Sequence, residues 1–244
     1  MKKIFAACIL TVMAFANIGN AQAFTEEQEA RIMELALEAI LANPEILPEA
    51  IDILQRRQEE QQSASLAQVL SARRELLERD PNAPVLGNPD GDVTVVEFFD
   101  YNCPYCKQAA PILKALIEQD NGVRLVYREW PILSEGSVFA ARAALASREQ
   151  GKYEEFHWAL MALPRANENS VLGAAESIGL DIEKLLIDMD APEIDEHIAL
   201  SMRLTQELGF QGTPSFVIGD AVAPGLIQLD QMKIMVEEAR ISGN

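Results

Sequence analysis

The sequence contains one pair of residues whose spacing is typical of redox chemistry, Cys103 and Cys106, with Pro104 and Tyr105 between them. The apolar run from Val93 to Phe99 comes just before this motif and predicts a buried strand, whereas a helical pattern follows it. The thiols are therefore expected at a helix N-terminus, where backbone N–H groups and the helix dipole favour thiolate. A thiolate with a second thiol within reach can carry out thiol–disulfide exchange.

The first 23 residues have the features of a secretory signal. Lys2 and Lys3 give a positive start, an apolar stretch follows, and residues 21–23 (Ala-Gln-Ala) form a small-residue cleavage site. The sequence predicts cleavage after Ala23, a mature chain that starts at Phe24, and export to the periplasm. A membrane anchor is the alternative, but the apolar run is short for a span of about 20 residues.

The third cysteine, Cys8, lies inside the predicted signal, with too few apolar residues before it for a lipoprotein cleavage site. Cys103 and Cys106 then remain in the mature chain. In an oxidising compartment cysteine pairs are normally structural, but a loop this short adds little stability and a chain of this length can bury a core without it. These considerations favour a redox-active disulfide.

The chain is acidic, with 20 Lys and Arg against 38 Asp and Glu and a net charge of −18. Removal of Lys2 and Lys3 with the signal leaves −20. This charge argues against nucleic acid and against anionic membrane as partners of the mature protein.

Residues 24–80 predict a helical segment. Thr25 and Gln28 form a capping box, Asn43-Pro44 interrupts the first helix, and Pro48 can occupy the first turn of a second. The polar run 55–62 fits either a solvated helix or a connector. The apolar stripes of this segment either fold back on the main domain or mediate oligomerisation, and periodicity alone leaves both open.

A Pro- and Gly-rich loop over 80–92 predicts a domain boundary. Strand 93–99, a helix from 103 to about 120 and strand 123–127 form a βαβ unit, which implies an α/β fold with parallel pairing. A helical block over about 134–208 precedes a short strand and turn at 215–220 and a final helix at 229–241. The block is expected to contain helices at 138–150, 153–163, 170–178, 181–189 and 194–208.

From about Pro81 to the C-terminus the chain resembles the DsbA-like branch of the thioredoxin superfamily. The resemblance rests on the run from Glu97 to Cys106, on the helical insertion and on residues 212–214, Gly-Thr-Pro. It implies a thioredoxin-like fold with a helical insertion, in which Thr213 precedes a cis proline, Pro214, that faces the cysteines. Residues 42–47, 55–57 and 84–92 are similar to ScsC-like exported proteins, some of which are trimeric disulfide isomerases. A homo-oligomer, with a trimer favoured, is therefore expected.

The resemblance also assigns roles. Cys103 is expected to be an exposed nucleophile, and the more buried Cys106 resolves the mixed disulfide. Pro104 and Tyr105 are expected to tune the reduction potential, and with Thr213 and Pro214 they bind substrate. Glu97 is expected to move the proton of the buried thiol, the alternative being a structural carboxylate.

Other residues have a structural and a functional interpretation. A Cu(I) half-site at Cys103 and Cys106 is possible, although no second cysteine pair or nearby histidine completes a metal site, and no cofactor is expected. His157 and His197 are interpreted as structural, and Met232 and Met235 as core residues rather than soft-metal ligands. Tyr101 and Tyr105 can form an apolar lip beside the cysteines.

Three functions follow. The first is an exported disulfide isomerase that acts on misfolded, cysteine-containing exported proteins and is kept reduced by a membrane thiol reductase of the ScsB or DsbD type. The second is a monomeric DsbA-like dithiol oxidase. The third is a Cu(I)-binding protein of copper tolerance. The helical segment before residue 80 is the feature that distinguishes the first from the second.

Overall fold

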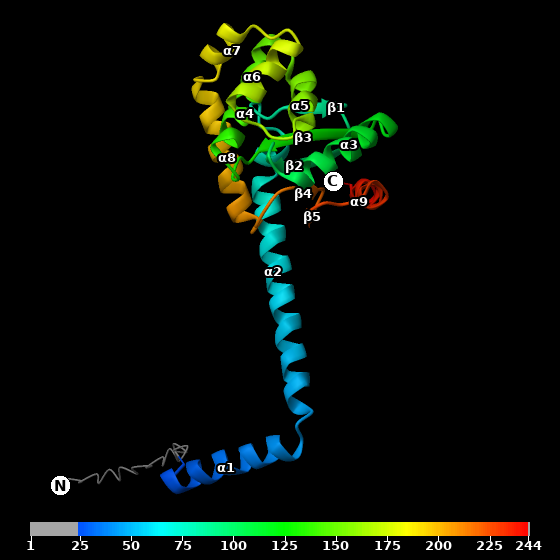
Figure 1. Cartoon of the computed structure of the whole chain (residues 1–244). Coiled ribbons are helices and arrows are strands. Elements are labelled where there is room, and N and C mark those ends of the chain that lie inside the picture. The colour runs from blue at the N-terminus through cyan, green and yellow to red at the C-terminus, as the bar shows by residue number, and fades with distance from the viewer. Residues whose placement is uncertain (1–23, 244) are drawn as a thin grey trace, which may run out of the picture. The chain divides into compact units, whose positions relative to one another are not determined.

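The computed structural model describes residues 24–243, which form two compact units that divide between Glu60 and Gln61 (Figure 1). The predicted signal peptide, its cleavage site and Cys8 lie outside the described residues. No helix among residues 24–243 combines the length and the apolar character needed to cross a bilayer.

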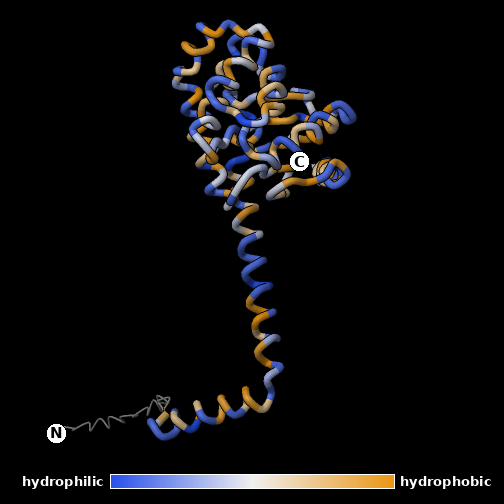
Figure 2. The backbone as a smooth tube through the Cα atoms, in the orientation of Figure 1, coloured by the Kyte–Doolittle hydropathy of each residue, from blue (hydrophilic) through white to orange (hydrophobic). Residues whose placement is uncertain are grey.

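The first unit consists of helix α1 (Glu26–Ala42) and the beginning of α2 (Ile46–Glu78). The predicted capping box starts α1, with the Gln28 backbone N–H donating to the Thr25 hydroxyl, and Asn43 ends it. Residues 55–62 are helical, so the polar run is a solvated stretch of α2. Every residue from 24 to 60 is exposed, and apolar residues recur along both helices, as the hydropathy colouring in Figure 2 shows.

The C-terminal part of α2 belongs to the second unit. Leu70 and Leu77 are almost fully buried, and they pack in an apolar cluster with Phe98, Leu204 and Leu208. Residues 61–80 therefore contribute to the core of the larger unit.

The second unit is built on a five-stranded sheet with the order β1-β3-β2-β4-β5. The strands are β1 (Val85–Gly87), β2 (Val93–Phe99), β3 (Val123–Glu129), β4 (Ser215–Ile218) and β5 (Ala221–Pro224). β2 and β3 are parallel, as the βαβ pattern predicts, and the other pairs are antiparallel. Strands β2 and β3 are buried on both faces, which explains the nearly continuous apolar sequence of β2, whereas β3 also buries Arg124, Arg128 and Glu129.

Side chains of β2 alternate between two apolar layers. Val95 and Phe99 belong to the layer that contains Cys106, whereas Val96 and Phe98 belong to the layer with Leu70 and Leu77. By this alternation Glu97 points toward the layer of the cysteines.

Helices α3 (Pro104–Gln119) and α9 (Leu229–Ser242) pack together on the cysteine side of the sheet, and α8 (Pro192–Glu207) contacts β3. The insertion between β3 and β4 contains α4 (Glu135–Ala146), η1 (Ser147–Gln150), α5 (Tyr153–Ala162), α6 (Glu168–Ser177), α7 (Ile182–Asp188) and α8. This is the predicted thioredoxin-like α/β fold with a helical insertion, preceded by N-terminal helices. Met232 is buried and Met235 packs against the same core, as interpreted from the sequence.

Two short strands are not predicted from the sequence. Residues 85–87, within the predicted loop, form β1, and residues 221–224 form β5. Both are edge strands of three or four residues, too short for a periodic pattern, and their pairing with β3 and β4 comes from tertiary contact.

A buried ionic network joins the end of α2 to the sheet and to α8. Arg128, on β3, lies 2.6 Å from the Asp80 carboxylate and also donates to the Leu76 carbonyl. His197 Nε2 lies 2.7 Å from Glu129 Oε2. Burial lowers the pKa of His197, but hydrogen bonds with Asp80 and Glu129 outweigh it, so the pKa is raised.

Both histidines have the structural setting that the sequence indicates. His197 lies in the ionic network, and His157 Nδ1 lies 3.0 Å from the Tyr101 hydroxyl within a group of aromatic rings. Burial lowers the pKa of His157 to about 3, so this ring is neutral at physiological pH.

Replacement of Arg128 by Met should lower the free energy of unfolding by about 3–5 kcal/mol, because the buried Asp80 carboxylate would lose the guanidinium at 2.6 Å and keep only His197, whose Nδ1 lies 3.5 Å away. Urea unfolding measures the loss. Arg73→Met is the matched control, since its pair with Glu207 is largely exposed, and it should cost much less. Equal losses in the two variants would show that the buried network is not what secures α2.

Candidate active site

Cys103 is the N-cap residue of α3, and Pro104 occupies the first helical turn. The turn before it is closed by a 3.0 Å hydrogen bond from the Cys103 N–H to the Asp100 carbonyl. Cys103 is only 4% exposed, so the prediction of an exposed nucleophile is wrong for this conformation. The thiol is covered by the loop at Thr213, whose carbonyl oxygen lies 3.2 Å from Sγ.

The environment of Cys103 favours its thiolate. A hydrogen bond from the Cys106 thiol is the main cause, and hydrogen bonds with the Thr213 side chain and with the backbone N–H groups of Cys106 and Tyr105 add to it. These contacts outweigh burial and lower the pKa of Cys103 to about 5. The sequence-based expectation of a stabilised thiolate at the helix start is met in these contacts.

Cys106 has the opposite electrostatics. It is fully buried in the first turn of α3, and burial, its hydrogen bond to Cys103 and the nearby Glu97 raise its pKa far above the ordinary value. Both cysteines are free thiols here. At neutral pH the pair is therefore a thiolate at Cys103 beside a protonated thiol at Cys106.

Glu97 lies in β2 between Tyr127 and Phe216, its register partners on the neighbouring strands. It is 1% exposed, and neither carboxylate oxygen has a hydrogen-bond partner in the protein. Burial and then the negative charges of Cys103 and Glu129 raise the pKa of Glu97 well above the ordinary value. A carboxyl group whose pKa is raised in this way can exchange a proton with the buried thiol, because its carboxylate form accepts the proton and its acid form returns it.

The loop from Gly212 to Pro214 faces Cys103 from more than a hundred residues along the chain. The Thr213–Pro214 peptide bond is cis, as predicted. Pro214 is buried, and its carbonyl accepts a 2.8 Å hydrogen bond from Gly225. A cavity of about 420 Å³ adjoins this loop and has a largely apolar lining that includes Leu208, Phe210 and Val222.

The surface around the motif is mixed. Pro104 and Tyr105 are exposed, with Tyr105 57% accessible, whereas Tyr101 is buried against Phe99 and His157. The predicted apolar lip is therefore formed by Tyr105 and not by Tyr101. The side chain of Tyr101 points into the core because its hydroxyl pairs with His157.

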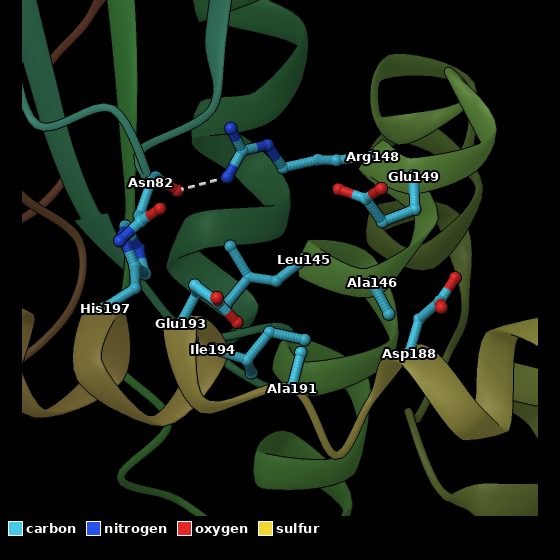
Figure 3. A pocket seen from close by; sticks show the side chains of 10 residues that line it. All are labelled: Asn82, Leu145, Ala146, Arg148, Glu149, Asp188, Ala191, Glu193, Ile194 and His197. Carbon is cyan, nitrogen blue, oxygen red and sulfur yellow. Dashed lines mark hydrogen bonds between the residues drawn. The ribbon is translucent and has the colours of Figure 1, made fainter.

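A second cavity, of about 410 Å³, lies elsewhere in the unit between η1 and α8 (Figure 3). It is lined by His197 and Glu193 together with Arg148, whose side chain donates to the Asn82 carbonyl at 2.6 Å. Its lining includes neither Cys103 nor Cys106, and neither Glu97 nor the cis-proline loop. Within residues 24–243 no group of three or more His, Cys, Asp or Glu side chains is arranged to hold a metal ion.

Three residues that surround the motif are not predicted as site residues from the sequence: Asp100, Asn102 and Lys107. Asp100 is buried and its Oδ2 accepts the backbone N–H groups of Ile132 and Leu133 at 2.8 and 3.0 Å. An Asp and an Asn between a strand and a helix are a recognisable turn signal, but their long-range partners have no trace in the local pattern.

The DSBA-like thioredoxin domain matches residues 94–236, and the chain belongs to this family. The N-terminal domain of the copper resistance protein ScsC matches residues 28–61. With the site described above, these matches define a thiol–disulfide oxidoreductase of the DsbA and ScsC type.

Individual relatives agree with this class. A thioredoxin-like oxidoreductase from Silicibacter pomeroyi DSS-3 is 62% identical, with 69% of this chain and 98% of that chain covered and a TM-score of 0.68. A linker-deleted ScsC variant from Proteus mirabilis is 28% identical, with 92% and 100% covered and a TM-score of 0.66. Disulfide bond formation protein D of Bacillus subtilis is 29% identical, with 64% of this chain and 76% of that protein covered.

The chain also matches Na(+)/H(+) antiporters, of which NhaA 3 from Salinispora tropica is 30% identical over 64% of this chain. The chain spans about a quarter of the length of these antiporters, the match covering 24% of NhaA 3.

Ultraviolet titration of the reduced protein should show a thiolate with a midpoint near pH 5, which Cys103→Ser abolishes. Cys106→Ala should raise that midpoint, because it removes the main hydrogen-bond donor to Cys103. Because the pKa of Cys103 is lower in the folded protein than in the unfolded chain, ionisation of this thiol stabilises the reduced fold. The stabilisation is complete above the ordinary thiol pKa of about 8.5, and it is lost as the pH falls through about 5. An unchanged midpoint in Cys106→Ala would contradict the assignment.

Glu97→Gln should slow the attack of Cys106 on a mixed disulfide by about a hundredfold, because the amide cannot accept the thiol proton. Stopped-flow release of a peptide bound at Cys103, followed across pH, measures this step. Formation of the same mixed disulfide in a Cys106→Ala background is the control and should be unaffected. The same release rate in both proteins at every pH would leave Glu97 as a structural carboxylate.

Proposed function

We propose that this protein is an exported protein disulfide isomerase that reshuffles wrong disulfides through Cys103 and Cys106. The observation that carries the proposal is the opposite ionisation of the two thiols under the Thr213–Pro214 loop. The reacting sulfur is ionised and ready to attack, while its neighbour holds a proton and attacks later.

In the proposed reaction the Cys103 thiolate attacks one sulfur of a substrate disulfide. The substrate S–S bond breaks, a mixed disulfide forms, and the other substrate sulfur leaves as a thiolate that takes a proton from solvent. A different substrate thiolate then attacks the substrate sulfur of the mixed disulfide, which returns Cys103 to its thiolate. The number of disulfides is unchanged, so no net oxidation or reduction occurs.

When no substrate thiolate attacks the mixed disulfide, Cys106 resolves it. After losing its proton, with the Glu97 carboxylate as the proposed acceptor, Cys106 attacks Cys103 Sγ. The bond between Cys103 and the substrate sulfur breaks, and the substrate leaves as a thiolate that takes a proton from solvent. The enzyme then holds a Cys103–Cys106 disulfide and the substrate is reduced by two electrons. To continue as an isomerase it must be reduced again, and a membrane thiol reductase of the ScsB or DsbD type is the proposed partner.

The substrate surface proposed here combines Tyr105, the Thr213–Pro214 loop and the adjoining apolar cavity. Exposed backbone at a cis-proline loop can pair with an extended peptide, and the cavity lined by Leu208, Phe210 and Val222 can take an apolar side chain beside the substrate cysteine. These features suit misfolded exported proteins, whose chains are extended and expose apolar residues.

The first unit supports the proposal of a homo-oligomer, with a trimer favoured. Ile32, Leu35 and Ile40 share one side of α1 and are 36–47% exposed, and Ile51 and Leu54 of α2 are 53% and 57% exposed. Apolar stripes on helices of this length are usually buried, and copies of the same segment supply the matching surface. Similarity of residues 28–61 to the ScsC N-terminal domain supports the same view.

Export to the periplasm, with the signal removed after Ala23, completes the proposal. A relative from Salmonella enterica that is 30% identical is described as a periplasmic thioredoxin-like protein. A dithiol pair that works on disulfides of exported proteins also needs to be where those disulfides form.

A dithiol oxidase is the second candidate, and the low pKa of Cys103 favours it. A stable thiolate stabilises the reduced form, which makes the disulfide form more oxidising. Cu(I) binding by the two thiols is a third activity that can coexist with either, and competitive Cu(I) titration of wild type against Cys103→Ser tests it.

Refolding of scrambled, disulfide-mismatched ribonuclease should be catalysed by the full-length protein and lost when residues 24–60 are deleted. The deletion ends at Glu60 because Leu70 and Leu77, further along α2, are part of the core of the second unit. The truncated protein should still oxidise dithiols. If the truncated protein refolds scrambled ribonuclease as fast as the full chain, the proposal that isomerase activity requires the oligomer is contradicted.

A matched pair of variants separates assembly from deletion in the same assay. Leu35→Lys places a charge on the apolar stripe of α1 and should give a monomer by light scattering without ribonuclease refolding. Glu38→Lys introduces the same side chain on the polar side of the helix and should leave mass and activity unchanged. If the Leu35→Lys protein is monomeric and retains isomerase activity, the activity does not depend on assembly.

A further inference from the structure

Two side chains that flank the CxxC motif reach the same loop of the helical insertion. This loop, Leu163–Ala166, connects α5 to α6. Asn102 comes just before Cys103, and Lys107 comes just after Cys106. The motif is thus attached on both sides to a segment about sixty residues further along the chain.

The Asn102 amide is held at both of its ends. Its Oδ1 accepts the backbone N–H of Ala166 at 2.8 Å, and its Nδ2 lies 2.9 Å from the Ala166 carbonyl. Nδ2 also lies 3.1 Å from the hydroxyls of Ser134 and Ser137. Ser134 is the N-cap of α4, so one amide connects the active-site turn to α4 and to the α5–α6 loop.

Lys107 holds the other end of the loop. Its ammonium donates to the Leu163 carbonyl at 2.5 Å, at the C-terminus of α5, where a cation is favoured by the helix dipole. The packing around Ala166 is equally close, because a Cβ on Gly136 would lie 2.2 Å from the Ala166 carbonyl oxygen. The insertion therefore presents a fixed surface to Asn102.

We infer that Asn102 is a positioning residue, which couples the helical insertion to the active-site turn and holds the Cys103 sulfur at the start of α3 beneath the Thr213 carbonyl. The inference rests on the proposed role of Cys103 as the nucleophile. The backbone of residue 102 is fixed from two directions, by its side chain and by its N–H, which donates to Asp100 Oδ1 at 2.7 Å. Residue 103 and the first turn of α3 follow directly.

Loss of the amide should release the turn and weaken the hydrogen bonds that the Cys103 thiolate receives. The backbone N–H groups of Tyr105 and Cys106 and the Cys106 thiol stabilise it only when Cys103 stays at the N-cap position. A turn that moves relative to α3 loses part of this stabilisation, so the thiolate becomes less stable. The disulfide form should then become less oxidising.

The test compares Asn102→Ala with Asn167→Ala in the full-length protein. Asn167 makes the same kind of side-chain bond, accepting the Ser170 N–H at 3.1 Å as the N-cap of α6, but its side chain forms no hydrogen bond with Asn102. Both variants should lower the midpoint of thermal unfolding. Only Asn102→Ala should lower the acid dissociation constant of Cys103, by about tenfold, as measured by thiolate absorbance. Only this variant should also make the reduction potential of the Cys103–Cys106 pair more negative in a glutathione titration.

Ser137→Ala is the milder variant, for the case in which Asn102→Ala does not fold, since it removes one acceptor of the Asn102 amide. It should shift the acid constant of Cys103 in the same direction by a smaller factor. The inference is overturned if the acid dissociation constant of Cys103 in Asn102→Ala is the same as in wild type. If only Ser137→Ala folds, the same comparison applies to that variant. Asn102 would then be a purely structural residue.

The same measurements distinguish this failure from a failure of the proposed function. Thiolate absorbance needs no substrate, so the effect of Asn102 is read whether or not the protein isomerises disulfides. A wild-type Cys103 that forms no mixed disulfide with a cysteine peptide would refute its role as nucleophile, on which the inference rests, and would thereby overturn the inference as well.

Discussion

The Cys103 thiolate depends on hydrogen-bond donors that exist together only where α3 begins. The thiol and backbone N–H of Cys106 and the backbone N–H of Tyr105 all belong to the first helical turn. A shift of the helix start by one residue would remove this set. Pro104, the Asp100 turn and the Asn102 contacts all fix that start, and β2 supplies a rigid point from which the turn leaves the sheet.

The remaining parts of the site differ in what they contribute. The cis-proline loop covers the nucleophile from above, the buried β2 strand places Glu97 beneath it, and the insertion holds its flank. With the cysteines at the start of α3, these groups come from four separate segments of the chain, and the sheet order β3-β2-β4 brings them together. The site therefore forms only with the whole second unit, including the end of α2 that Asp80 and Arg128 attach to it.

The sequence predicts the features that depend on local patterns of residues. The β2 strand, the helix after the cysteines, the capping box at Thr25 and the break at Asn43-Pro44 follow from apolar periodicity, capping residues and proline sterics. The cis bond before Pro214 and the thioredoxin-like arrangement follow from resemblance. Burial of Cys103 could not be predicted in this way, because the atom that covers it belongs to Thr213, 110 residues away. The short edge strands β1 and β5, and the contacts of Asn102, depend on similar distant partners.

The acidity of Cys103 has a kinetic consequence. A group with a pKa of about 5 is about 90% ionised at pH 6 and almost fully ionised at pH 8. The fraction of Cys103 that is present as the attacking thiolate is thus nearly constant between pH 6 and pH 8. A dependence of turnover on pH in this range then comes from the proton held by Cys106 or from the thiols of the substrate, and not from the ionisation of Cys103.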